Sequence, residues 1–419
     1  MNIQMIGIDH SLAGVNVREQ YSFTSSQAGR AMQQIKKQPG IRGCILLSTC
    51  NRMELYVSTN GEEANLVDLI TKIRQGPQQT DPCRQYFISR SGEEAVRHLF
   101  YLAAGYRSRI LGEDQILTQV KDALKKSREL YCTDNLLEVL FRHAVTAGKE
   151  VKTKAPPLHA DYSAVHCAIE GMKQQGYVFE GKKCLVIGNG QMGKIAAQAL
   201  QEAGASVTVT VRQYRSGMVE IPKGCARIHY GERYTQIPEC DLIISATVSP
   251  NVTVQKEALE RARGGVVKQQ IYIDLAVPRD MEEQIAELEG VTLYNIDSFQ
   301  SDTLDMPDGF SSETVLRKEA AEKMIEQRLA EFKNWYECRT LVPKIQQIGE
   351  TAADDICWRM GRGLQQFSQN EQACIRTMVK ESSQKTVDRM LFALRDELSA
   401  AELQHCMQIL EQCIKRNRS

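Results

Sequence analysis

Residues 183–200 read KCLVIGNGQMGKIAAQAL, and this stretch decides the fold of the middle of the chain. KCLVI predicts a buried strand, and the apolar spacing after the glycines predicts a helix. The first glycine of GNGQMG permits a tight turn, the second lets the backbone approach a pyrophosphate, and the third allows close packing of helix on sheet. Phosphate would lie at the positive end of that helix. The stretch therefore predicts a Rossmann-like dinucleotide-binding domain, whose cofactor-binding residues are Gly188, Asn189, Gly190, Gln191, Met192 and Gly193.

The next predicted strand ends in basic residues, which bears on the choice of dinucleotide. SVTVTV (206–211) is followed by Arg212 and Arg215, and no carboxylate occurs before Glu220. An NAD site usually has Asp or Glu at this point, to bind the ribose 2′-hydroxyl, whereas guanidinium groups suit a 2′-phosphate. We therefore expect NADPH, bound in part by Arg212 and Arg215. The alternative is that both arginines only solvate a loop.

The regions around this stretch have different patterns. Apolar runs at 241–246 and 270–275 predict further strands of a parallel sheet covered on both faces. Before it, strands at 3–8, 43–47 and 53–57 mix with helical spacing at 26–37, 62–74, 92–104 and 135–153, and Pro156-Pro157 marks a linker. From about 312 the spacing is helical, with a long helix over 313–337 and amphipathic stretches at about 344–366, 370–394 and 398–415.

These patterns predict a multidomain α/β protein. Its parts are an α+β domain at 1–158, a Rossmann-like NADP-binding domain at 159–300, and a long helix followed by a helical bundle at 301–419. The bundle could serve for dimerisation, or it could be a cap folded back on its own chain.

The composition excludes several classes of protein. The 419 residues include 52 Lys+Arg and 52 Asp+Glu, and 42% are hydrophobic, which is typical of globular chains and not of disordered ones. No apolar run approaches the ~20 residues of a membrane helix, and no signal-peptide core is present. Thirteen cysteines without CxxC pairs or zinc spacing predict a cytoplasmic protein with reduced thiols, no disulfide framework and no metal site.

One cysteine stands apart from the others. CILLSTCNRMELYV (44–57) predicts two strands joined by a polar turn, and Cys50 lies in that turn. Arg52 would stabilise a thiolate at Cys50 and lower its pKa, as nucleophilic cysteines require. Thr49 and Asn51 offer hydrogen-bond donors for an anionic substrate or an oxyanion. Cys50 is therefore a candidate nucleophile, whereas Cys44, inside the apolar strand, is expected to be packing.

A reactive thiol beside a nicotinamide cofactor suggests acyl transfer to sulfur, followed by hydride reduction of the thioester to an aldehyde. That reaction needs a proton donor, and His98 is the candidate. On helix 92–104 the apolar face is formed by Val96, Leu99, Phe100 and Ala103, and His98 points nearly opposite. Its alternative is a solvated surface histidine.

Taken together, the motifs resemble the glutamyl-tRNA reductase family. The resemblance rests on STCNRMELY (48–56), EEAVRHLF (93–100), ILGEDQILTQVKDA (110–123), GNGQMG (188–193) and DLAVPRD (274–280). The N-terminal GIDHSLAGVNVREQYSF and the later YNIDSF and EAAEKMIEQRLAEFKNW are also similar to that family. The resemblance runs from residue 3 into the C-terminal helices and is weakest after about 345.

The resemblance implies NADPH-dependent reduction of glutamyl-tRNA to glutamate-1-semialdehyde with release of tRNA, the first step of tetrapyrrole synthesis. It implies that Cys50 is the nucleophile that holds a glutamyl thioester and that His98 is the acid/base residue. It also implies a catalytic domain, a cofactor domain and a spinal helix that ends in a dimerisation domain, in a homodimer that can hand its product to an aminotransferase. The substrate-binding candidates are Thr49, Asn51, Arg52, Ser108, Glu113, Asp114, Gln115 and Gln119.

The chain departs from the family pattern in places, so we expect a divergent member. Where the family usually reads GLDSxVLGEPQILGQV, residues 105–120 differ at Tyr106, Arg107, Arg109, Asp114 and Thr118. Two other functions stay open: an NADPH-dependent reductase of another activated acyl group, or a non-catalytic paralogue that binds tRNA or a tetrapyrrole.

Zero net charge does not exclude a tRNA partner, because the charge is distributed by region. Basic side chains crowd two neighbouring predicted helices of the first domain, and acidic ones are plentiful in 280–331. A local basic surface is enough to contact tRNA phosphates. Its residues are Lys121, Lys125, Lys126, Arg128, Lys149, Lys152 and Lys154.

Overall fold

The computed structural model describes residues 1–76, 82–107, 114–155, 164–212, 220–299 and 312–416. It forms two compact units, residues 1–325 and residues 326–419. The domain boundaries predicted after residues 158 and 300 lie outside the described residues and stay predictions.

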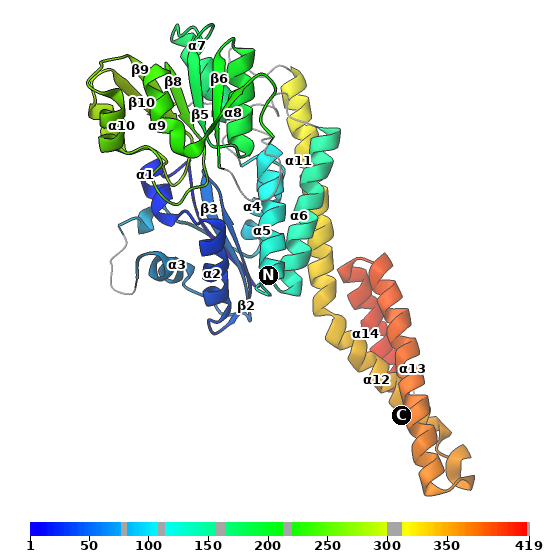
Figure 1. Cartoon of the computed structure of the whole chain (residues 1–419). Coiled ribbons are helices and arrows are strands. Elements are labelled where there is room, and N and C mark those ends of the chain that lie inside the picture. Colours follow the sequence, from blue (N-terminus) through cyan, green and yellow to red (C-terminus); the bar gives the residue numbers. More distant parts are fainter. Residues whose placement is uncertain (77–81, 108–113, 156–163, 213–219, 300–311, 417–419) are drawn as a thin grey trace. The chain divides into compact units, whose positions relative to one another are not determined.

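A small antiparallel sheet organises the N-terminal part of the first unit (Figure 1). Its strand order is β2-β3-β1-β4. The strands are β1 (Ile3–Asp9), β2 (Ile41–Ser48), β3 (Arg52–Thr59) and β4 (Ile88–Ser91), and β3 is buried along its whole length. Because successive side chains of a strand point to opposite faces, β3 presents Met53, Leu55 and Val57 to one face and Arg52, Glu54 and Tyr56 to the other.

Helices cover both faces of this sheet. Met53, Leu55 and Val57 share an apolar core with α2 (Ser25–Lys36) and α3 (Leu66–Gln75). The opposite face is covered by α4 (Gly92–Ala103) and α6 (Asn135–Lys154), where Tyr56 and Phe141 make an edge-to-face ring contact at 5.3 Å. Helix α5 (Asp114–Glu129) packs along edge strand β2. Capping explains two of the helix starts, because Thr24 forms a capping box at α2 and Asp134 caps α6.

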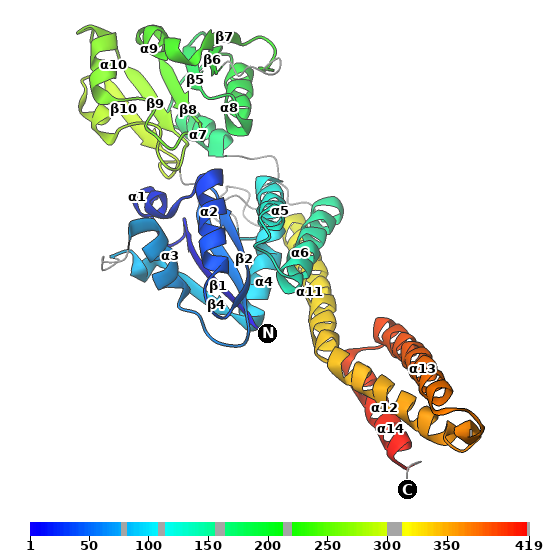
Figure 2. The same ribbon diagram turned by 60° about the horizontal axis from the view of Figure 1, so that its bottom comes forward.

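The second sheet is entirely parallel, with strand order β10-β9-β8-β5-β6-β7 (Figure 2). Its strands are β5 (Lys183–Ile187), β6 (Ser206–Val211), β7 (Ala226–His229), β8 (Leu242–Ser245), β9 (Gln270–Asp274) and β10 (Val291–Asn295). The order reverses between β5 and β8, which is where ligands bind in open α/β sheets. The Rossmann-like fold predicted from the glycine run is confirmed.

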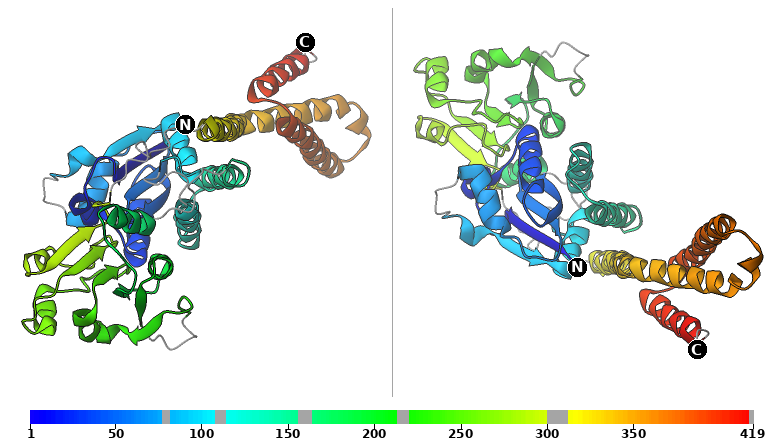
Figure 3. Two further views of the ribbon diagram at one scale, coloured as in Figure 1. Left: turned by 90° about the horizontal axis from the view of Figure 1, so that it is seen from above. Right: turned by 90° about the horizontal axis from the view of Figure 1, so that it is seen from below.

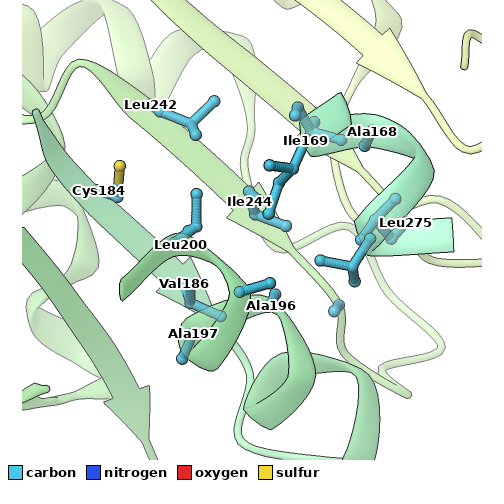
Figure 4. Close-up of a cluster of buried hydrophobic side chains, with 14 of the residues drawn as sticks. Ala168, Ile169, Cys184, Val186, Ala196, Ala197, Leu200, Leu242, Ile244 and Leu275 are labelled. Carbon is cyan, nitrogen blue, oxygen red and sulfur yellow. The ribbon is translucent and has the colours of Figure 1, made fainter. Parts of the chain in front are cut away.

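The two faces of the parallel sheet have separate apolar cores. On one face, Cys184 and Val186 of β5 pack with α7 (Ala164–Gln174) and α8 (Gln191–Glu202), as Figure 4 shows. On the other, Leu185 and Ile187 pack with α10 (Lys256–Arg263) and the segment around the short helix α9 (Arg233–Gln236). The continuous apolar run of β5 follows from this burial on both faces.

Three strands were missed by the sequence patterns, and all three lie at sheet edges. They are β4, β7 and β10, whose residues are mostly half-buried or exposed. An edge strand packs on fewer neighbours and needs no continuous apolar run, so it leaves a weaker periodic signal than a central strand.

The described residues from 312 to 416 are mostly helical: α11 (Ser312–Thr340), which begins in the first unit, and α12 (Val342–Met360), α13 (Gln369–Glu397) and α14 (Ala400–Arg416). They match the predicted helical stretches, and Pro343 lies in the first turn of α12, where proline is tolerated. Helices α13 and α14 lie on opposite sides of α12 (Figure 3). Their shared core includes Ile345, Leu391, Leu403 and Met407.

The close crossing of α4 and α6 depends on a glycine. A Cβ placed on Gly148 would lie 2.4 Å from the carbonyl oxygen of Ala103. We expect Gly148→Ala to lower the free energy of unfolding by about 1–3 kcal/mol, because backbone must move to accept the methyl group. Gly29→Ala in α2 is the matched control, since its Cβ would meet only the ends of two flexible side chains, Leu130 at 3.0 Å and Lys126 at 3.4 Å, and alanine favours helix. Urea unfolding of the two variants measures the difference, and equal midpoints would contradict the close crossing.

Candidate active site

The turn between β2 and β3 carries Cys50 and is held by its own neighbours. The backbone N–H of Thr49 donates to the carbonyl oxygen of Arg52 at 2.9 Å, and the Thr49 hydroxyl oxygen accepts from the N–H groups of Asn51 and Arg52, both at 3.2 Å. The carbonyl of Asn51 accepts from the N–H of His10 at 3.0 Å. The Asn51 side chain is buried, and its Oδ1 has no hydrogen-bond partner among the described residues. Cys50, half-buried, is thus presented by a defined turn rather than a loose loop.

A buried carboxylate lies next to this turn, on the face of β3 that α4 and α6 cover. Oε1 of Glu54 lies 2.8 Å from Nη1 of Arg52 and 3.0 Å from Nε2 of His98, and the Tyr56 hydroxyl donates to Oε2 at 2.7 Å. Glu54 is 1% exposed, Arg52 2% and His98 4%. The four side chains form one polar network inside an otherwise apolar layer, which we call the Glu54 network.

The Glu54 network keeps its carboxylate ionised. Burial by itself raises the pKa of Glu54, but the charges and hydrogen bonds of His98, Arg52 and Tyr56 outweigh burial and hold the pKa of this carboxyl well below its usual range. Burial and the neighbouring Glu54 raise the pKa of Tyr56 well above its usual value, so Tyr56 stays a donor. Burial opposes the charge of Arg52, but Glu54 and Asp9 overcome it and raise its pKa.

The structure corrects the expected exposure of His98. Helix α4 is buried on more than one side, because it packs on β1 and β4 of the sheet and also on α5 and α6, and His98 is buried with Val96, Leu99 and Phe100. Its Nε2 faces Glu54, and its Nδ1 is buried with no hydrogen-bond partner among the described residues. A buried ring nitrogen without a partner is available to a ligand or a proton.

Arg52 is more engaged than the sequence suggested. Besides Glu54, its Nη1 lies 3.8 Å from Oδ2 of Asp9, and its Nη2 donates to the carbonyl oxygen of Arg107. A substrate carboxylate would therefore share the Arg52 guanidinium with Glu54.

The Cys50 turn also contacts the parallel-sheet domain. Cys50 packs against the apolar cluster that α7, α8 and the parallel sheet form. Nε of Arg18, at the end of α1 (Val15–Arg18), donates to the carbonyl oxygen of Cys50 at 3.3 Å, and Nη2 of Arg18 lies 2.9 Å from Oδ1 of Asp297. Val15 is buried in the same cluster, and its N–H donates to Oδ2 of Asp297 at 2.9 Å.

A second ion pair joins the domain of the antiparallel sheet to the domain of the parallel sheet. Nε of Arg279 lies 2.9 Å from Oε2 of Glu19, and Nη2 of Arg279 donates to Oδ1 of Asn16. The segment around α1 is therefore tied to the parallel-sheet domain at both Asp297 and Arg279, beside the candidate nucleophile. Sequence reasoning missed these residues because the partners lie about 260–280 positions apart.

The glycine loop has the geometry of a dinucleotide cradle. A Cβ on Gly193 would lie 2.1 Å from the carbonyl oxygen of Gly188, and Gly188 has φ of +109° and lies against the Ala246 carbonyl. A Cβ on Gly190 would meet no atom within 4 Å, so this glycine borders open space. Gly190 is the N-cap of helix α8 and offers no side-chain cap, and Oδ1 of Asn189 is buried without a hydrogen-bond partner among the described residues. These features fit a pyrophosphate at the helix N-terminus.

The end of β6 carries a stacked cationic group. The Arg212 guanidinium lies 4.3 Å from the centre of the Tyr230 ring, and Arg233 lies 4.2 Å from that ring centre. Arg212 is exposed. Arg215 and the rest of 213–219 lie outside the described residues, so the prediction for Arg215 stays untested.

Two buried carboxyl groups lie near the carboxyl ends of β8 and β9. Asp274, at the end of β9, accepts hydrogen bonds from the backbone N–H groups of Ala276, Asp280 and Met281 at 2.8–3.0 Å. Asp280 accepts from the hydroxyls of Ser245 and Thr247 at 2.7 and 2.6 Å. Burial raises the pKa of Asp274 to about 7, with the charge of Asp280 adding to it, and burial also raises the pKa of Asp280. Together they fix the loops that follow β8 and β9.

The remaining predicted substrate residues are only partly described. Ser108 and Glu113 lie outside the described residues, and so does the side chain of Asp114, the first residue of α5. Nε2 of Gln115 lies 3.2 Å from the sulfur of Met192, so the 110–123 motif meets the glycine loop there. Gln119 is half-buried one turn further along α5.

Part of the positive charge of the predicted basic surface on α5 and α6 is neutralised by neighbouring acidic side chains. Arg128 pairs with Glu138 at 2.5 Å, Lys154 with Glu150 at 2.6 Å and Lys125 with Glu129 at 3.9 Å. The Lys126 ammonium is hydrogen-bonded to Ser25, and burial lowers its pKa. Its use as a tRNA footprint stays a prediction.

Among the described residues, no cluster of three or more His, Cys, Asp or Glu side chains is arranged to bind a metal ion. None of the described helices has the length and hydropathy of a membrane span.

Glu54 is the site residue that sequence reasoning missed although a signal was present. RMELY places Arg52, Glu54 and Tyr56 at alternate positions of a strand that is otherwise apolar. Three polar side chains on one face of a buried strand predict a polar network within the core.

The comparisons with known proteins cover nearly the whole chain. Residues 6–155 match the family model of the glutamyl-tRNAGlu reductase N-terminal domain, residues 170–301 that of shikimate/quinate 5-dehydrogenase, and residues 320–415 that of the glutamyl-tRNAGlu reductase dimerisation domain. The glutamyl-tRNA reductase of Acetivibrio thermocellus is 36% identical over 340 residues, which are 81% of this chain and 98% of that one. That of Desulfitobacterium hafniense is 32% identical over 386 residues, 89% of this chain and 85% of the relative. The solved glutamyl-tRNA reductase of Methanopyrus kandleri is 25% identical, covers 99% of both chains and gives a TM-score of 0.46.

A parallel-sheet domain of dehydrogenase type beside a thiol-bearing turn defines a nicotinamide-dependent oxidoreductase. With these relatives, the chain belongs to the glutamyl-tRNA reductase family.

The Glu54 network makes stability depend on pH. Because the folded-state pKa of Glu54 lies below its unfolded value of about 4.3, its ion pairs stabilise the fold fully above about pH 5 and lose that effect as the pH falls further. We expect Glu54→Gln to lower the free energy of unfolding at pH 7 by about 3–5 kcal/mol, because it leaves Arg52 buried without its main counterion. The variant should also lose less stability than the wild type as the pH falls below about 5.

Urea unfolding between pH 3 and pH 7 measures both effects. Glu129→Gln is the control, since Glu129 is 63% exposed and its pair with Lys125 is worth less than about 1 kcal/mol. If the free energy of unfolding of Glu54→Gln fell with pH as steeply as that of the wild type, this carboxylate would not be the source of the pH dependence.

Proposed function

We propose that this protein reduces glutamyl-tRNA to glutamate-1-semialdehyde with NADPH, through a glutamyl thioester on Cys50, as the first step of tetrapyrrole synthesis. The observation that carries the proposal is the position of Cys50. This cysteine is presented by a fixed turn of a domain that matches the family's N-terminal model, and it packs against the domain that holds the glycine loop.

In the first step the Cys50 thiolate attacks the ester carbonyl, the C–O bond to tRNA breaks, and tRNA leaves with a free 3′-terminal ribose hydroxyl. The ester is already activated, so no ATP is required. The neighbouring Arg52 guanidinium stabilises negative charge at this end of β3, although its positive charge is already paired with Glu54. The buried Oδ1 of Asn51 can accept a hydrogen bond from the substrate's amino group.

His98 is proposed to exchange the proton that these steps require. Glu54 holds Nε2 of His98 at 3.0 Å, which orients the ring and leaves Nδ1 for the substrate side. A carboxylate that fixes one ring nitrogen sets which tautomer is presented at the other. Glu54 therefore acts on the substrate through His98 and Arg52.

The cofactor site is proposed to be the edge of the parallel sheet at β5 and β6. The N–H groups at the start of α8 would bind the pyrophosphate, and Arg212 would bind a 2′-phosphate. When bound, NADPH supplies the hydride that reduces the thioester to the aldehyde and frees the Cys50 thiol. The ion pairs of Arg18 and Arg279 keep this domain against the Cys50 turn, where the transfer must occur.

The helical bundle of α12–α14 is proposed to pair two chains into a homodimer. It matches a dimerisation-domain model and exposes large apolar side chains, including Trp358 (70%), Met378 (64%) and Met390 (63%). Exposed apolar side chains in such numbers are typical of association surfaces.

We expect Cys50→Ser to lower the turnover rate of glutamyl-tRNA by on the order of 10³-fold or more, because a serine hydroxyl is far less ionised than a thiol. Without NADPH, the wild-type protein should retain labelled glutamate as a thioester, and Cys50→Ser should retain none. Cys374→Ser, at an exposed position of α13, is the control and should behave as wild type. Full turnover by Cys50→Ser would overturn the thioester route.

The choice of cofactor is tested separately. We expect Arg212→Ala to raise KM for NADPH on the order of 10–100-fold and to leave KM for NADH nearly unchanged, since only NADPH carries the 2′-phosphate. Arg227→Ala, on the adjacent strand β7, is a matched loss of an exposed arginine and should change neither value. A wild-type protein that prefers NADH would refute the assignment.

A further inference from the structure

Two buried cysteines of the N-terminal part touch each other and have no part in the proposed reaction. Cys44 lies on β2, and Cys132 follows the turn at the end of α5. They are 0% and 1% exposed, and both are free thiols. The two thiols influence each other's pKa. The Cys44 thiol donates to the carbonyl oxygen of Met32 at 3.3 Å, and the Cys132 thiol donates to that of Leu130 at 3.4 Å.

The backbone places the two residues at disulfide distance. The N–H of Cys44 donates to the carbonyl oxygen of Cys132 at 2.8 Å. Standard bond lengths then keep the two Cα atoms within about 6.7 Å of each other, inside the range of about 4.4–6.8 Å in which disulfides occur. Ser127 fixes the same contact from α5, because its hydroxyl donates to the carbonyl oxygen of Cys44 at 2.7 Å. The backbones of the two residues are therefore close enough for a disulfide.

The two thiols differ in acidity in the way that oxidation requires. The interaction with the Cys44 thiol and the charge of Lys36 lower the pKa of Cys132 to about 7, against the opposing effect of burial. The same interaction, with burial, raises the pKa of Cys44. Near neutral pH Cys132 is thus partly a thiolate, which is the form that an oxidant attacks, and Cys44 is a protonated partner.

Cys132 lies directly beneath the surface. The preceding residue, Tyr131, is 87% exposed and has φ of +55°, an unfavourable conformation for a side chain other than glycine. A local opening of this turn therefore exposes Cys132 without unfolding the sheet.

We infer that Cys44 and Cys132 form a reversible disulfide when a hydroperoxide reaches the protein, tying β2 to the end of α5. The Cys132 thiolate takes the terminal oxygen of hydrogen peroxide to become a sulfenic acid, and the peroxide O–O bond breaks to release hydroxide. The Cys44 sulfur then attacks the sulfenic sulfur, an S–S bond forms, and the sulfenic oxygen leaves as water. In total two thiols and one hydrogen peroxide give one disulfide and two waters, and a dithiol reductant reverses the change.

A second pair of buried cysteines offers a matched comparison. Cys184 and Cys240 are each 1% exposed, in the parallel-sheet domain. Burial raises the pKa of both, to about 12 and about 11, and the Cys240 thiol donates to the Gln236 carbonyl at 3.4 Å. Neither thiol of this pair is a thiolate near neutral pH, so peroxide should leave them unchanged.

The test uses the full-length Cys50→Ser variant, which removes the reactive thiol from the tryptic peptide that contains Cys44. The reduced protein is treated with hydrogen peroxide at pH 7.5, quenched with N-ethylmaleimide, digested with trypsin and analysed by mass spectrometry. We expect peptide 43–52 joined to peptide 129–142, at the summed mass less two hydrogens, and loss of this species on reduction. Cys184 and Cys240 should remain unoxidised.

Single substitutions separate the two steps. In the Cys50→Ser background, Cys44→Ala should leave Cys132 as a sulfenic acid that dimedone labels, because no resolving thiol remains. Cys132→Ser should leave Cys44 as a free thiol. The proposal is overturned if peroxide takes Cys132 to higher acids while Cys44 stays reduced, or if Cys184 and Cys240 are joined as fast as Cys44 and Cys132. Because no substrate or NADPH is used, the result is independent of the proposed reaction.

Discussion

A single ionised carboxylate inside the first domain fixes most of the candidate site. Taking an isolated carboxylate out of water costs several kcal/mol even after relaxation, so Glu54 is stable only with its partners in place. Those partners come from β3 itself and from α4, and Arg52 in turn reaches Asp9 on β1. Two strands and a helix must therefore assemble together. The positions of His98 and Arg52, beside the Cys50 turn, follow from that one requirement.

The parallel-sheet domain depends on close backbone packing instead of charge. Its glycine loop is tied to β6, because the N–H of Gly188 donates to the Thr210 hydroxyl at 3.0 Å. It is also packed so tightly that neither Gly188 nor Gly193 can carry a Cβ, while Gly190 faces open space. The three glycines have the three distinct roles that the dinucleotide fold assigns to them. Asp274 and Asp280 fix the loops after β8 and β9 with hydrogen bonds, so this part of the carboxyl edge is preorganised.

Sequence patterns predicted the central elements well and the connections between them poorly. The buried strands β3 and β5 and the helices α4 and α6 are rich in apolar residues, because each packs on several neighbours, so their sequences carry a strong signal. The edge strands β4, β7 and β10 do not. The burial of His98 could not be read from α4 alone, since a helix enclosed on two sides has no polar face to mark its solvent side. Cys50, Arg52 and the glycine loop were found because their chemistry is local. Arg18 and Asp297 were not, because a contact between residues so far apart in sequence leaves no local pattern.

The ion pair between Arg18 and Asp297 has a consequence for how the chain is made. Arg18 is synthesised 279 residues before its partner, and at a translation rate of about 5–20 residues per second it waits roughly 14 to 56 s. During that interval the first domain has left the ribosome with Val15 uncovered and Arg18 unneutralised. The segment around α1 therefore completes its contacts only after the strand and turn that end at Asp297 have emerged.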